Sequence, residues 1–255
     1  MLFESNIYGP IRSRRLGSSL GVNLLLSQAK ICTFDCIYCE CGFNTPAMGE
    51  KLPSRTSIQR QLKEKLQSLV EENIPLDVIT FSGNGEPTMH PDFHRIIDDT
   101  IALRNEYFPD AKVTVLSNST QIHRPEVVAA LLRADNCLMK FDSANEYTMR
   151  CIDQPQQSYF TTQWLIDHLC RFDGKLIVQS IFIRGEYDGK SFDNTTEVEV
   201  NEWLDALQRI KPKQVMIYPI DRATPAKNLE KVTIDELNTI AERVRKLGID
   251  VLVVG

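Results

Sequence analysis

The most informative part of the sequence is CTFDCIYCEC, the ten-residue run from Cys32 to Cys41. It contains four of the seven cysteines in a chain of 255 residues. In a reducing compartment, crowded cysteines are typical of metal ligands or redox groups and not of disulfides. The run therefore predicts a metal or cluster site, and the rest of the chain has to supply the scaffold that carries it.

The first three cysteines of the run, Cys32, Cys36 and Cys39, have the spacing C-x3-C-x2-C. Three thiolates on one short loop can hold three corners of a [4Fe–4S] cluster, because cysteine thiolate is the usual iron–sulfur ligand. The fourth iron would then be open to substrate. Zinc is the main alternative, but a structural zinc site takes four ligands, typically in two pairs. Cys41 is either that fourth ligand, at an awkward C-x-C spacing, or a wall of the cluster pocket.

Around this run, short apolar segments alternate with amphipathic segments of helical period. The segments expected to be strands are Leu20–Leu26, Asp77–Phe81, Lys112–Leu116, Cys137–Phe141, Leu176–Ile183 and Gln214–Tyr218, with a seventh at Asp250–Val254. The segments expected to be helices are Thr56–Glu72, Pro91–Glu106, Arg124–Arg133, Phe160–Phe172, Glu197–Arg209 and Thr233–Leu247. The chain therefore consists of six β-then-α units in succession.

This succession implies a parallel sheet with right-handed crossovers. A closed barrel needs eight such units, so six units predict an α/β fold of the open kind, a partial (βα)6 TIM-like barrel with the helices outside. A flat, doubly wound sheet is the competing fold. In both folds, ligands bind at the carboxyl ends of the strands. The cysteine run follows the first expected strand and so lies at such an end.

The expected organisation is one domain over residues 1–255, with an N-terminal arm at 1–19, a cluster-binding loop at 27–55 and an extra strand within 249–255. The formal net charge of −5 argues against bulk binding of nucleic acid but allows a local basic groove. No apolar run has the length of a membrane span, and no signal peptide opens the chain. We therefore expect a cytoplasmic protein without a membrane partner.

The cysteine run resembles the signature of the radical S-adenosylmethionine (SAM) superfamily, C-x3-C-x-aromatic-C, with Tyr38 at the aromatic position. The resemblance covers most of the chain and implies a radical SAM core domain. It implies that Cys32, Cys36 and Cys39 carry a [4Fe–4S] cluster whose open iron binds the amino and carboxylate groups of SAM. The expected enzyme is an Fe–S oxidoreductase that cleaves SAM reductively to methionine and a 5′-deoxyadenosyl radical, with flavodoxin or ferredoxin as electron donor.

The second expected strand ends in FSGNGEPTMHP, residues 81–91. Glycines after a strand let a ligand approach the backbone closely, and Glu86 adds a carboxylate. This stretch is similar to the family's GGE element, whose acidic residue binds the methionine ammonium of SAM, and Gly83, Gly85 and Glu86 are the matching positions. Asn84 interrupts the glycine pair. The alternative is a glycine turn before the next helix, with Glu86 solvated.

Two further strand ends carry polar residues. Ser117 and Asn118, in LSNST, could bond the ribose or carboxylate of SAM, or they form a turn, where such residues are common. Lys140 and Asp142, in CLMKFDSA, point to the same face of a regular strand. An apolar strand should not bury a lysine unpaired. Lys140 therefore either neutralises the SAM carboxylate or forms a structural pair with Asp142 or Glu86.

Weaker cofactor candidates lie on the last two expected strands. Gln179 is expected to point inward from the fifth strand, and Tyr218 lies near the end of the sixth. Tyr38 and the backbone around Tyr218 are the expected contacts of the adenine ring.

Arginines mark the expected substrate side. Arg12, Arg14 and Arg15 crowd into YGPIRSRRLGSSLG, residues 8–21, and Arg222 follows the sixth strand. Guanidinium groups suit phosphate or carboxylate recognition, while the alternative is a solvated arm or an internal ion-pair anchor. The pattern GPIRSRRLG…SLGVNLL…CTFDCIYCE is most similar to the wyosine-synthesis branch of the superfamily, which acts on a guanosine of transfer RNA. This chain lacks the extra N-terminal cysteines that serve a second cluster in those enzymes.

We therefore expect transfer RNA or another phosphate-bearing substrate. A glycyl-radical activase or a peptide-modifying radical SAM enzyme is the alternative within the same chemistry. A zinc-stabilised RNA-binding module is a third hypothesis, but six βα units form a larger scaffold than such a module needs.

Overall fold

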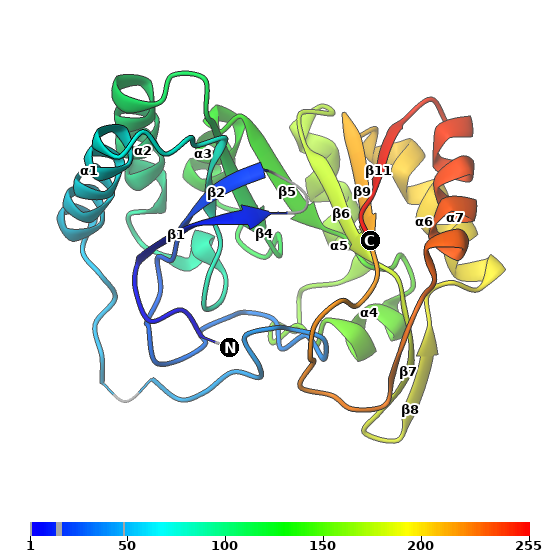
Figure 1. Ribbon diagram of the computed structural model, residues 1–255. Helices are drawn as coiled ribbons and strands as arrows, with labels where there is room; N and C mark the ends of the chain where they lie inside the picture. Colours follow the sequence, from blue (N-terminus) through cyan, green and yellow to red (C-terminus); the bar gives the residue numbers. More distant parts are fainter. Residues whose placement is uncertain (1, 14–16, 48) are drawn as a thin grey trace. The chain divides into compact units, whose positions relative to one another are not determined.

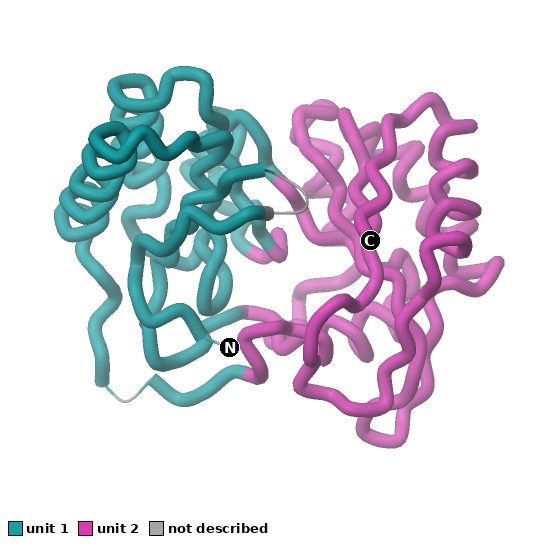
Figure 2. The backbone as a smooth tube through the Cα atoms, in the orientation of Figure 1, with its two compact units in different colours: residues 1–32, 44–117, 121–137 teal, residues 33–43, 118–120, 138–255 magenta. Residues whose placement is uncertain are grey.

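The computed structural model describes residues 2–13, 17–47 and 49–255. The chain divides into two compact units (Figure 2). Unit 1 comprises residues 1–32, 44–117 and 121–137, and unit 2 comprises residues 33–43, 118–120 and 138–255. The division falls within the cysteine run, because Cys32 belongs to unit 1 whereas Cys36 and Cys39 belong to unit 2.

Unit 1 is built on four strands in the order β1-β2-β3-β4 (Figure 1). Strands β2, β3 and β4 are parallel, and β1 pairs antiparallel with β2. Its strands are β1 (Ile7–Ser13), β2 (Gly17–Val22), β3 (Val78–Phe81) and β4 (Lys112–Ser117). Its helices are α1 (Arg55–Glu71), the 3-10 helix η1 (Pro87–Met89), α2 (Phe93–Tyr107) and α3 (Pro125–Arg133).

Strand β5 (Asn136–Lys140) leads along the chain into unit 2, where it is followed by β6, β9 and β11 in a parallel order β5-β6-β9-β11. These strands are β6 (Ile177–Ile181), β9 (Gln214–Tyr218) and β11 (Asp250–Val253). The helices are α4 (Glu146–Ile152), α5 (Thr162–Leu169), the 3-10 helix η2 (Cys170–Phe172), α6 (Glu197–Ile210) and α7 (Ile234–Lys246). None of the helices that the structure describes is both long enough and apolar enough to cross a membrane.

Unit 2 also contains a small antiparallel sheet that the sequence did not predict, in the order β10-β7-β8. Its strands are β7 (Ile183–Tyr187), β8 (Lys190–Asp193) and β10 (Leu229–Lys231). Strand β7 begins directly after β6, and β10 follows the loop after β9. The small sheet therefore continues from the carboxyl ends of two parallel strands, which is the end where this class of fold binds ligands.

The elements form where local sequence and burial agree. Helix α1 buries four apolar residues that recur every three or four positions, namely Ile58, Leu62, Leu66 and Leu69. Thr233 and Glu236 form a capping box at the start of α7, which satisfies two free N–H groups of the first turn. All four residues of β3 are buried, as expected for a parallel strand covered on both faces.

The faces of the strands differ in character. In unit 2, Trp203 of α6 donates from its indole N–H to the Phe141 carbonyl (3.2 Å) and to the Ser180 hydroxyl (3.1 Å). Helix α6 therefore covers the face that carries the side chain of Ser180. Because side chains alternate along a strand, Gln179 and Ile181 project from the opposite face. The carboxyl ends of these strands thus present Gln179 away from the packed helix.

Most predicted elements are confirmed within two or three residues, and the exceptions have physical causes. The strand expected at Leu20–Leu26 begins at Gly17 and ends at Val22. Beyond Val22 the backbone no longer pairs with a neighbouring strand, because side-chain amides take up its carbonyls. Asn6 donates to the carbonyl of Asn23 (2.9 Å), and Asn84 donates to that of Leu26 (2.8 Å).

Two further expectations differ from the structure, and one helix was not expected. The arm expected over residues 1–19 contains strand β1, whose pairing with β2 makes it part of unit 1. The strand expected at Leu176–Ile183 is two strands, because Asn194 binds the Ile183 N–H (2.7 Å) and turns the chain into β7. Helix α4 was not predicted. It is short and depends on Asn145, whose side chain accepts the N–H groups of Tyr147 and Thr148.

The turn after β3 holds the start of the cysteine loop. The Ile31 N–H donates to the Asn84 carbonyl (2.9 Å), and the Glu86 N–H donates to the Ile31 carbonyl (3.2 Å). Between these two bonds lies Gly85, with φ +138°, where an added Cβ would lie 1.7 Å from the Ile31 carbonyl oxygen. Only glycine lets the two backbones approach this closely.

We expect Gly85→Ala to lower the free energy of unfolding by about 2–4 kcal/mol, because it combines positive-φ strain with a backbone clash. Urea denaturation of the apoprotein measures this change. Gly189→Ala is the matched control, since Gly189 also has positive φ (+69°) but nothing within 4 Å of an added Cβ. The control should lose only about 1–2 kcal/mol. Equal losses in both variants would contradict the close approach of Ile31 to Gly85.

Candidate active site

The first cysteine of the run is anchored by an asparagine. The Cys32 N–H donates to the side-chain oxygen of Asn44 (3.1 Å), and the Asn44 amide donates back to the Cys32 carbonyl (3.1 Å). This two-bond pairing fixes the backbone of Cys32 and leaves its side chain half-buried. Cys32 also follows directly after Ile31, which is bonded to the turn after β3.

The other two cysteines share a turn in unit 2. The Cys39 N–H donates to the Cys36 carbonyl (3.1 Å), which closes the turn. The segment before it runs along the end of α4. The backbone N–H of Asp35 donates to the Asp153 carbonyl (3.0 Å), and that of Ile37 donates to the Ile152 carbonyl (3.0 Å). Cys36 is buried and Cys39 is half-buried, and neither is in a disulfide.

The donor set fits an iron–sulfur cluster. In the described ranges 2–13, 17–47 and 49–255, no three His, Cys, Asp or Glu side chains converge as a single metal ion would require. A [4Fe–4S] cluster makes a different demand, because each cysteine binds a different iron and the thiolates stand apart. Three cysteines on one loop, none of them in a disulfide and two of them on one closed turn, are compatible with that demand.

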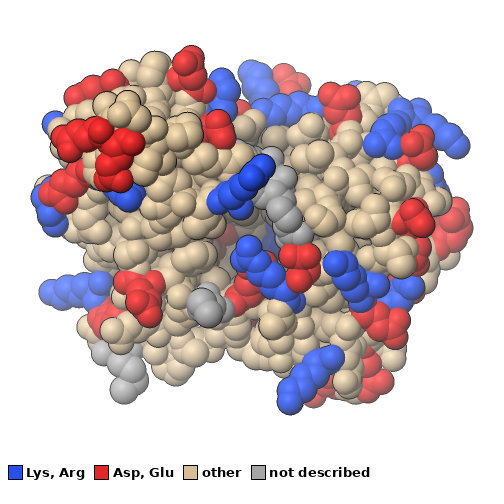
Figure 3. All heavy atoms as spheres, in the orientation of Figure 1, with Lys and Arg blue, Asp and Glu red and all other residues tan. Residues whose placement is uncertain are grey.

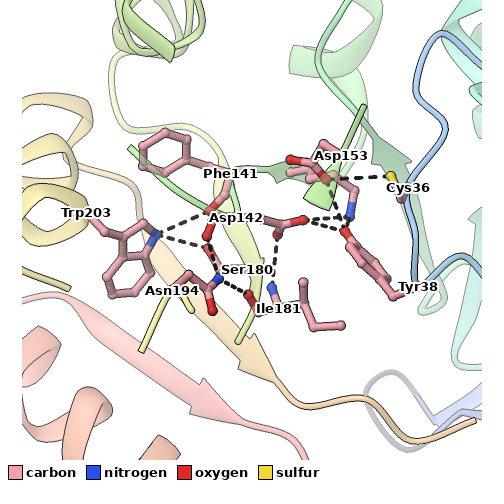
Figure 4. Close-up of polar contacts among 10 residues, drawn as sticks. Cys36, Tyr38, Phe141, Asp142, Asp153, Ser180, Ile181, Asn194 and Trp203 are labelled. Carbon is pink, nitrogen blue, oxygen red and sulfur yellow. Dashed lines mark hydrogen bonds and ion pairs between the residues drawn. The ribbon is translucent and has the colours of Figure 1, made fainter. Parts of the chain in front are cut away.

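Tyr38, between Cys36 and Cys39, lies in a buried polar network in unit 2 (Figure 4). Its hydroxyl donates to Asp142 Oδ2, and it accepts a hydrogen bond from Lys140 Nζ. Lys140 Nζ also lies 3.4 Å from Asp142 Oδ2 and 4.8 Å from the centroid of the Tyr38 ring. Of the alternatives for Lys140, the structure shows the pair with Asp142.

Asp153 completes this network, and sequence reasoning missed it. Its Oδ1 atom lies 3.6 Å from the Cys36 sulfur and 3.4 Å from the Tyr38 hydroxyl oxygen. Asp153 caps the end of α4, a helix too short for periodicity to reveal. An aspartate in such a stretch is usually a turn residue, so only the folded structure places it beside a cysteine.

The network shifts the pKa values of its members. Burial raises the pKa of the Tyr38 phenol, and the charge of Asp142 raises it further. Burial alone would lower the pKa of the Lys140 ammonium, but the Asp142 carboxylate outweighs it, so that pKa is well above its usual value. Burial also raises the pKa of Asp153, with the neighbouring Asp142 as the next cause. Tyr38 therefore keeps its proton and Lys140 its charge.

A second group of predicted residues lies in unit 1, around Glu86. It is only 2% exposed, so the alternative of a solvated Glu86 is wrong. Its Oε1 atom accepts hydrogen bonds from the Thr88 N–H (3.0 Å), the Thr88 hydroxyl and the Ser117 hydroxyl (2.9 Å). The structure thus brings together Glu86 and Ser117, which were predicted from two different strand ends.

The glycines beside Glu86 serve close contacts within the protein. An added Cβ at Gly83 would lie 2.5 Å from the Asn23 side-chain oxygen, and one at Gly85 would meet Ile31. Asn84, which interrupts the glycine pair, is fully buried. Its side chain accepts the Phe3 N–H (2.8 Å) and donates to the Phe3 carbonyl (2.9 Å). This element therefore fixes the N-terminal segment and the cysteine loop to the end of β3.

Asn118 is separated from Ser117 by the division between the units. Its side-chain amide donates to the Thr33 hydroxyl (2.8 Å), and its oxygen accepts the Thr120 N–H (3.1 Å). The Thr33 and Thr120 hydroxyls are also bonded to each other (2.6 Å). Asn118 thus anchors Thr33, the residue after Cys32. It lies in a turn, which was the alternative to a contact with SAM.

Gln179 and Tyr218 lie on neighbouring strands of unit 2. Gln179 pairs in register with Lys140 and is buried, with its amide 3.9 Å from the sulfur of Met216. Tyr218 ends β9, is half-buried, and packs on an apolar cluster that includes Ile37 of the cysteine loop. The strand ends thus bring both residues to the part of unit 2 that carries Tyr38.

The predicted arginines are exposed or lie outside the described residues. Arg12 is exposed on β1, and Arg14 and Arg15 fall in the segment that the structure does not describe. Arg222 forms an ion pair with Glu40 (2.6 Å), and both side chains are more than half exposed. On the face shown in Figure 3, positive and negative side chains are interspersed.

Comparisons with known proteins identify the family of the chain. The Radical SAM superfamily matches residues 27–197. A protein of Brachyspira hyodysenteriae named GTPase Obg is 29% identical over 242 residues, which are 92% of this chain but 33% of that protein. A UPF0026 protein of Helicobacter pylori is 28% identical over 233 residues, 91% of this chain and 71% of that protein. The chain thus spans about a third of the first relative's length.

The fold has solved counterparts. A radical SAM methyltransferase from Sphaerobacter thermophilus superposes with a TM-score of 0.67 at 16% identity, over 92% of this chain and 65% of that one. This likeness confirms the predicted α/β fold, the partial TIM-like barrel. Members of the matched superfamily are enzymes that use a [4Fe–4S] cluster and SAM, so the predicted enzyme class and cofactors are confirmed too. Because the match covers more than half of its length, the chain belongs to the radical SAM superfamily.

Proposed function

We propose that Cys32, Cys36 and Cys39 hold the [4Fe–4S] cluster of a radical SAM enzyme. The observation that carries this proposal is that the cysteine loop is anchored by hydrogen bonds on both sides of Cys32. Ile31 is bonded to the turn after β3, and Thr33 is bonded to Asn118. When bound, the cluster and SAM supply the electron transfer that cleaves SAM to methionine and a 5′-deoxyadenosyl radical. The electron would come from a flavodoxin or a ferredoxin.

The protein's own groups hold the cofactors in this proposal. Glu86 would accept the ammonium of SAM, supported by its burial and its position on the turn that binds Ile31. A buried carboxylate gains from an opposite charge, and an ammonium supplies one. Ser117 would keep the Glu86 carboxylate oriented. Lys140 remains a candidate for the SAM carboxylate, since its side chain is partly exposed beside the Tyr38 network.

Replacing any one of Cys32, Cys36 or Cys39 by alanine should abolish the cluster after anaerobic reconstitution, because each removes the ligand of one iron. Iron and sulfide analysis with absorption spectroscopy measures the loss. Cys41→Ala is the matched control from the same loop and should keep much of the cluster. A colourless wild-type protein that holds one zinc and no iron would contradict the proposal.

Glu86→Gln should weaken SAM binding by about tenfold or more, because it removes a charge-assisted hydrogen bond while keeping the shape of the side chain. The measurement is equilibrium binding of SAM to reconstituted protein of verified iron content. Ser117→Ala is the control, since it removes one donor to Glu86 but leaves the carboxylate. It should have a smaller effect. Unchanged affinity in Glu86→Gln would remove Glu86 from the SAM site.

The proposed substrate is transfer RNA or another phosphate-bearing molecule. Two exposed guanidinium groups support it. Arg12 is exposed on β1, and Arg222 forms an exposed ion pair with Glu40. Exposed pairs of this kind contribute about 0–1 kcal/mol, so a phosphate could replace the Glu40 carboxylate at little cost.

If RNA binds through these arginines, its affinity should fall steeply with added salt, and Arg12→Ala should lower the slope of log affinity against log salt by about 1. Arg60→Ala is the control, because Arg60 is an exposed arginine on α1 paired with Glu64. Mass spectrometry of transfer-RNA nucleosides from cells with and without this gene tests the activity. Identical profiles together with salt-independent RNA binding would redirect the search to peptides and small metabolites.

A further inference from the structure

Asp142 collects hydrogen bonds from three segments of unit 2 (Figure 4). Its Oδ2 atom accepts the Tyr38 hydroxyl of the cysteine loop, and its Oδ1 atom accepts the Ile181 N–H at the end of β6 (2.9 Å). Its carbonyl accepts the side-chain amide of Asn194, which follows β8 (2.8 Å). The residue is only 1% exposed. One buried residue thus connects the cysteine loop with two elements of the scaffold.

The carboxylate of Asp142 is already occupied. Oδ1 is taken by a backbone N–H, and Oδ2 is shared by the Tyr38 hydroxyl and the Lys140 ammonium. An ionised carboxylate prefers such charge-assisted partners, which are stronger than neutral hydrogen bonds. A role in binding the cofactor directly would require Asp142 to give up one of them. The contacts therefore favour a structural task over the cofactor contact that the sequence suggested.

The contact with Tyr38 shows which segment Asp142 restrains. Tyr38 lies one residue before Cys39 and two after Cys36, in the turn closed by the Cys39 N–H. Its hydroxyl is held from one side by Asp142 and from the other by Lys140. A ring fixed at its far end cannot swing, so the backbone that carries both cysteines is restrained as well.

The scaffold behind Asp142 is itself restrained. The Asn194 side chain donates to the carbonyls of Asp142 (2.8 Å) and Ile181 (2.8 Å), and its oxygen accepts the Ile183 N–H (2.7 Å). Asn194 therefore fixes the ends of β5 and β6 against the start of β7. A site built on such fixed elements holds its ligands more accurately than a loop alone.

We propose that Asp142 is a positioning residue, which through Tyr38 holds the turn of Cys36 and Cys39 in the arrangement that the cluster requires. This inference rests on the proposed function, because it assigns the order of the turn to cluster binding. It predicts that the effect of Asp142 on the loop passes through the Tyr38 hydroxyl. Removing either group should then have the same consequence, and removing both should add little.

The first test uses the apoprotein and needs no cluster. Hydrogen–deuterium exchange of peptides covering residues 33–43 is compared in wild type, Tyr38→Phe, Asp142→Asn and the double variant. Each single variant should raise the exchange of this segment about tenfold, and the double variant should not exceed them. Tyr8→Phe is the matched control, since it removes a tyrosine hydroxyl that is bonded to Ser82 (2.8 Å) within unit 1, whereas residues 33–43 belong to unit 2. It should leave the segment unchanged.

The second test uses the reconstituted protein. In competition with a chelator, both single variants should hold iron about 10- to 100-fold less tightly than wild type, the loss of affinity typical when a residue that orients a metal ligand is removed. The electron paramagnetic resonance spectrum of the reduced cluster should also change, which general destabilisation would not cause. Tyr38→Phe keeps the test decisive if Asp142→Asn does not fold, because it deletes a single oxygen.

The outcomes separate the two proposals. Wild-type exchange and iron affinity in Tyr38→Phe and Asp142→Asn, with a normal cluster in the wild type, would overturn the role of Asp142 alone. Equal loosening of residues 33–43 in Tyr8→Phe would also overturn it, since the effect would then be general. A wild type that takes up no iron would overturn the proposed function and this role with it.

Discussion

The backbone pairing of Ile31 with the turn after β3 is the constraint on which the rest of the site depends. Two hydrogen bonds, to the Asn84 carbonyl and from the Glu86 N–H, place the start of the cysteine loop directly against Gly85. Because Cys32 is the next residue, its position follows from this contact. The same contact fixes the backbone of Glu86. One short pairing therefore brings Cys32 and the buried carboxylate of Glu86 into a fixed relation within unit 1.

Side-chain amides supply many of the hydrogen bonds that fix the loops around the site. Asn84 bonds Phe3 and Leu26, Asn44 bonds Cys32, and Asn194 bonds Asp142 and Ile181. An amide can donate and accept at once, so it can pair with irregular backbone where no strand is available. Buried backbone groups must be paired, and loops around a site break regular pairing. The asparagines resolve this conflict at the ends of β2, β5 and β6.

These amides also explain how far sequence reasoning could go. Alternating apolar and amphipathic segments predicted the parallel strands and their helices, and the cysteine spacing predicted the family. Periodicity could not show that β2 ends at Val22 or that β7 starts after Phe182, since side-chain bonds from Asn6, Asn84 and Asn194 decide those limits. The glycines were expected to let a ligand approach the backbone, and the close contacts that the structure shows at Gly83 and Gly85 are with Asn23 and Ile31. No sequence pattern indicated that Asp153 would lie beside Cys36.

Charged groups near the cysteines of unit 2 occur in two kinds of surroundings. Lys140 and Tyr38 are half-buried around the buried Asp142, and the contacts among the three hold their side chains in one arrangement. Glu40 and Arg222 form an exposed pair on the residue next to Cys39. Such a pair holds its partners weakly and can exchange one anion for another. Cofactor chemistry requires fixed groups, whereas binding and release of a charged substrate require exchangeable ones. The cysteine loop therefore carries its fixed contacts at Tyr38 and its exchangeable one at Glu40, two residues further along the chain.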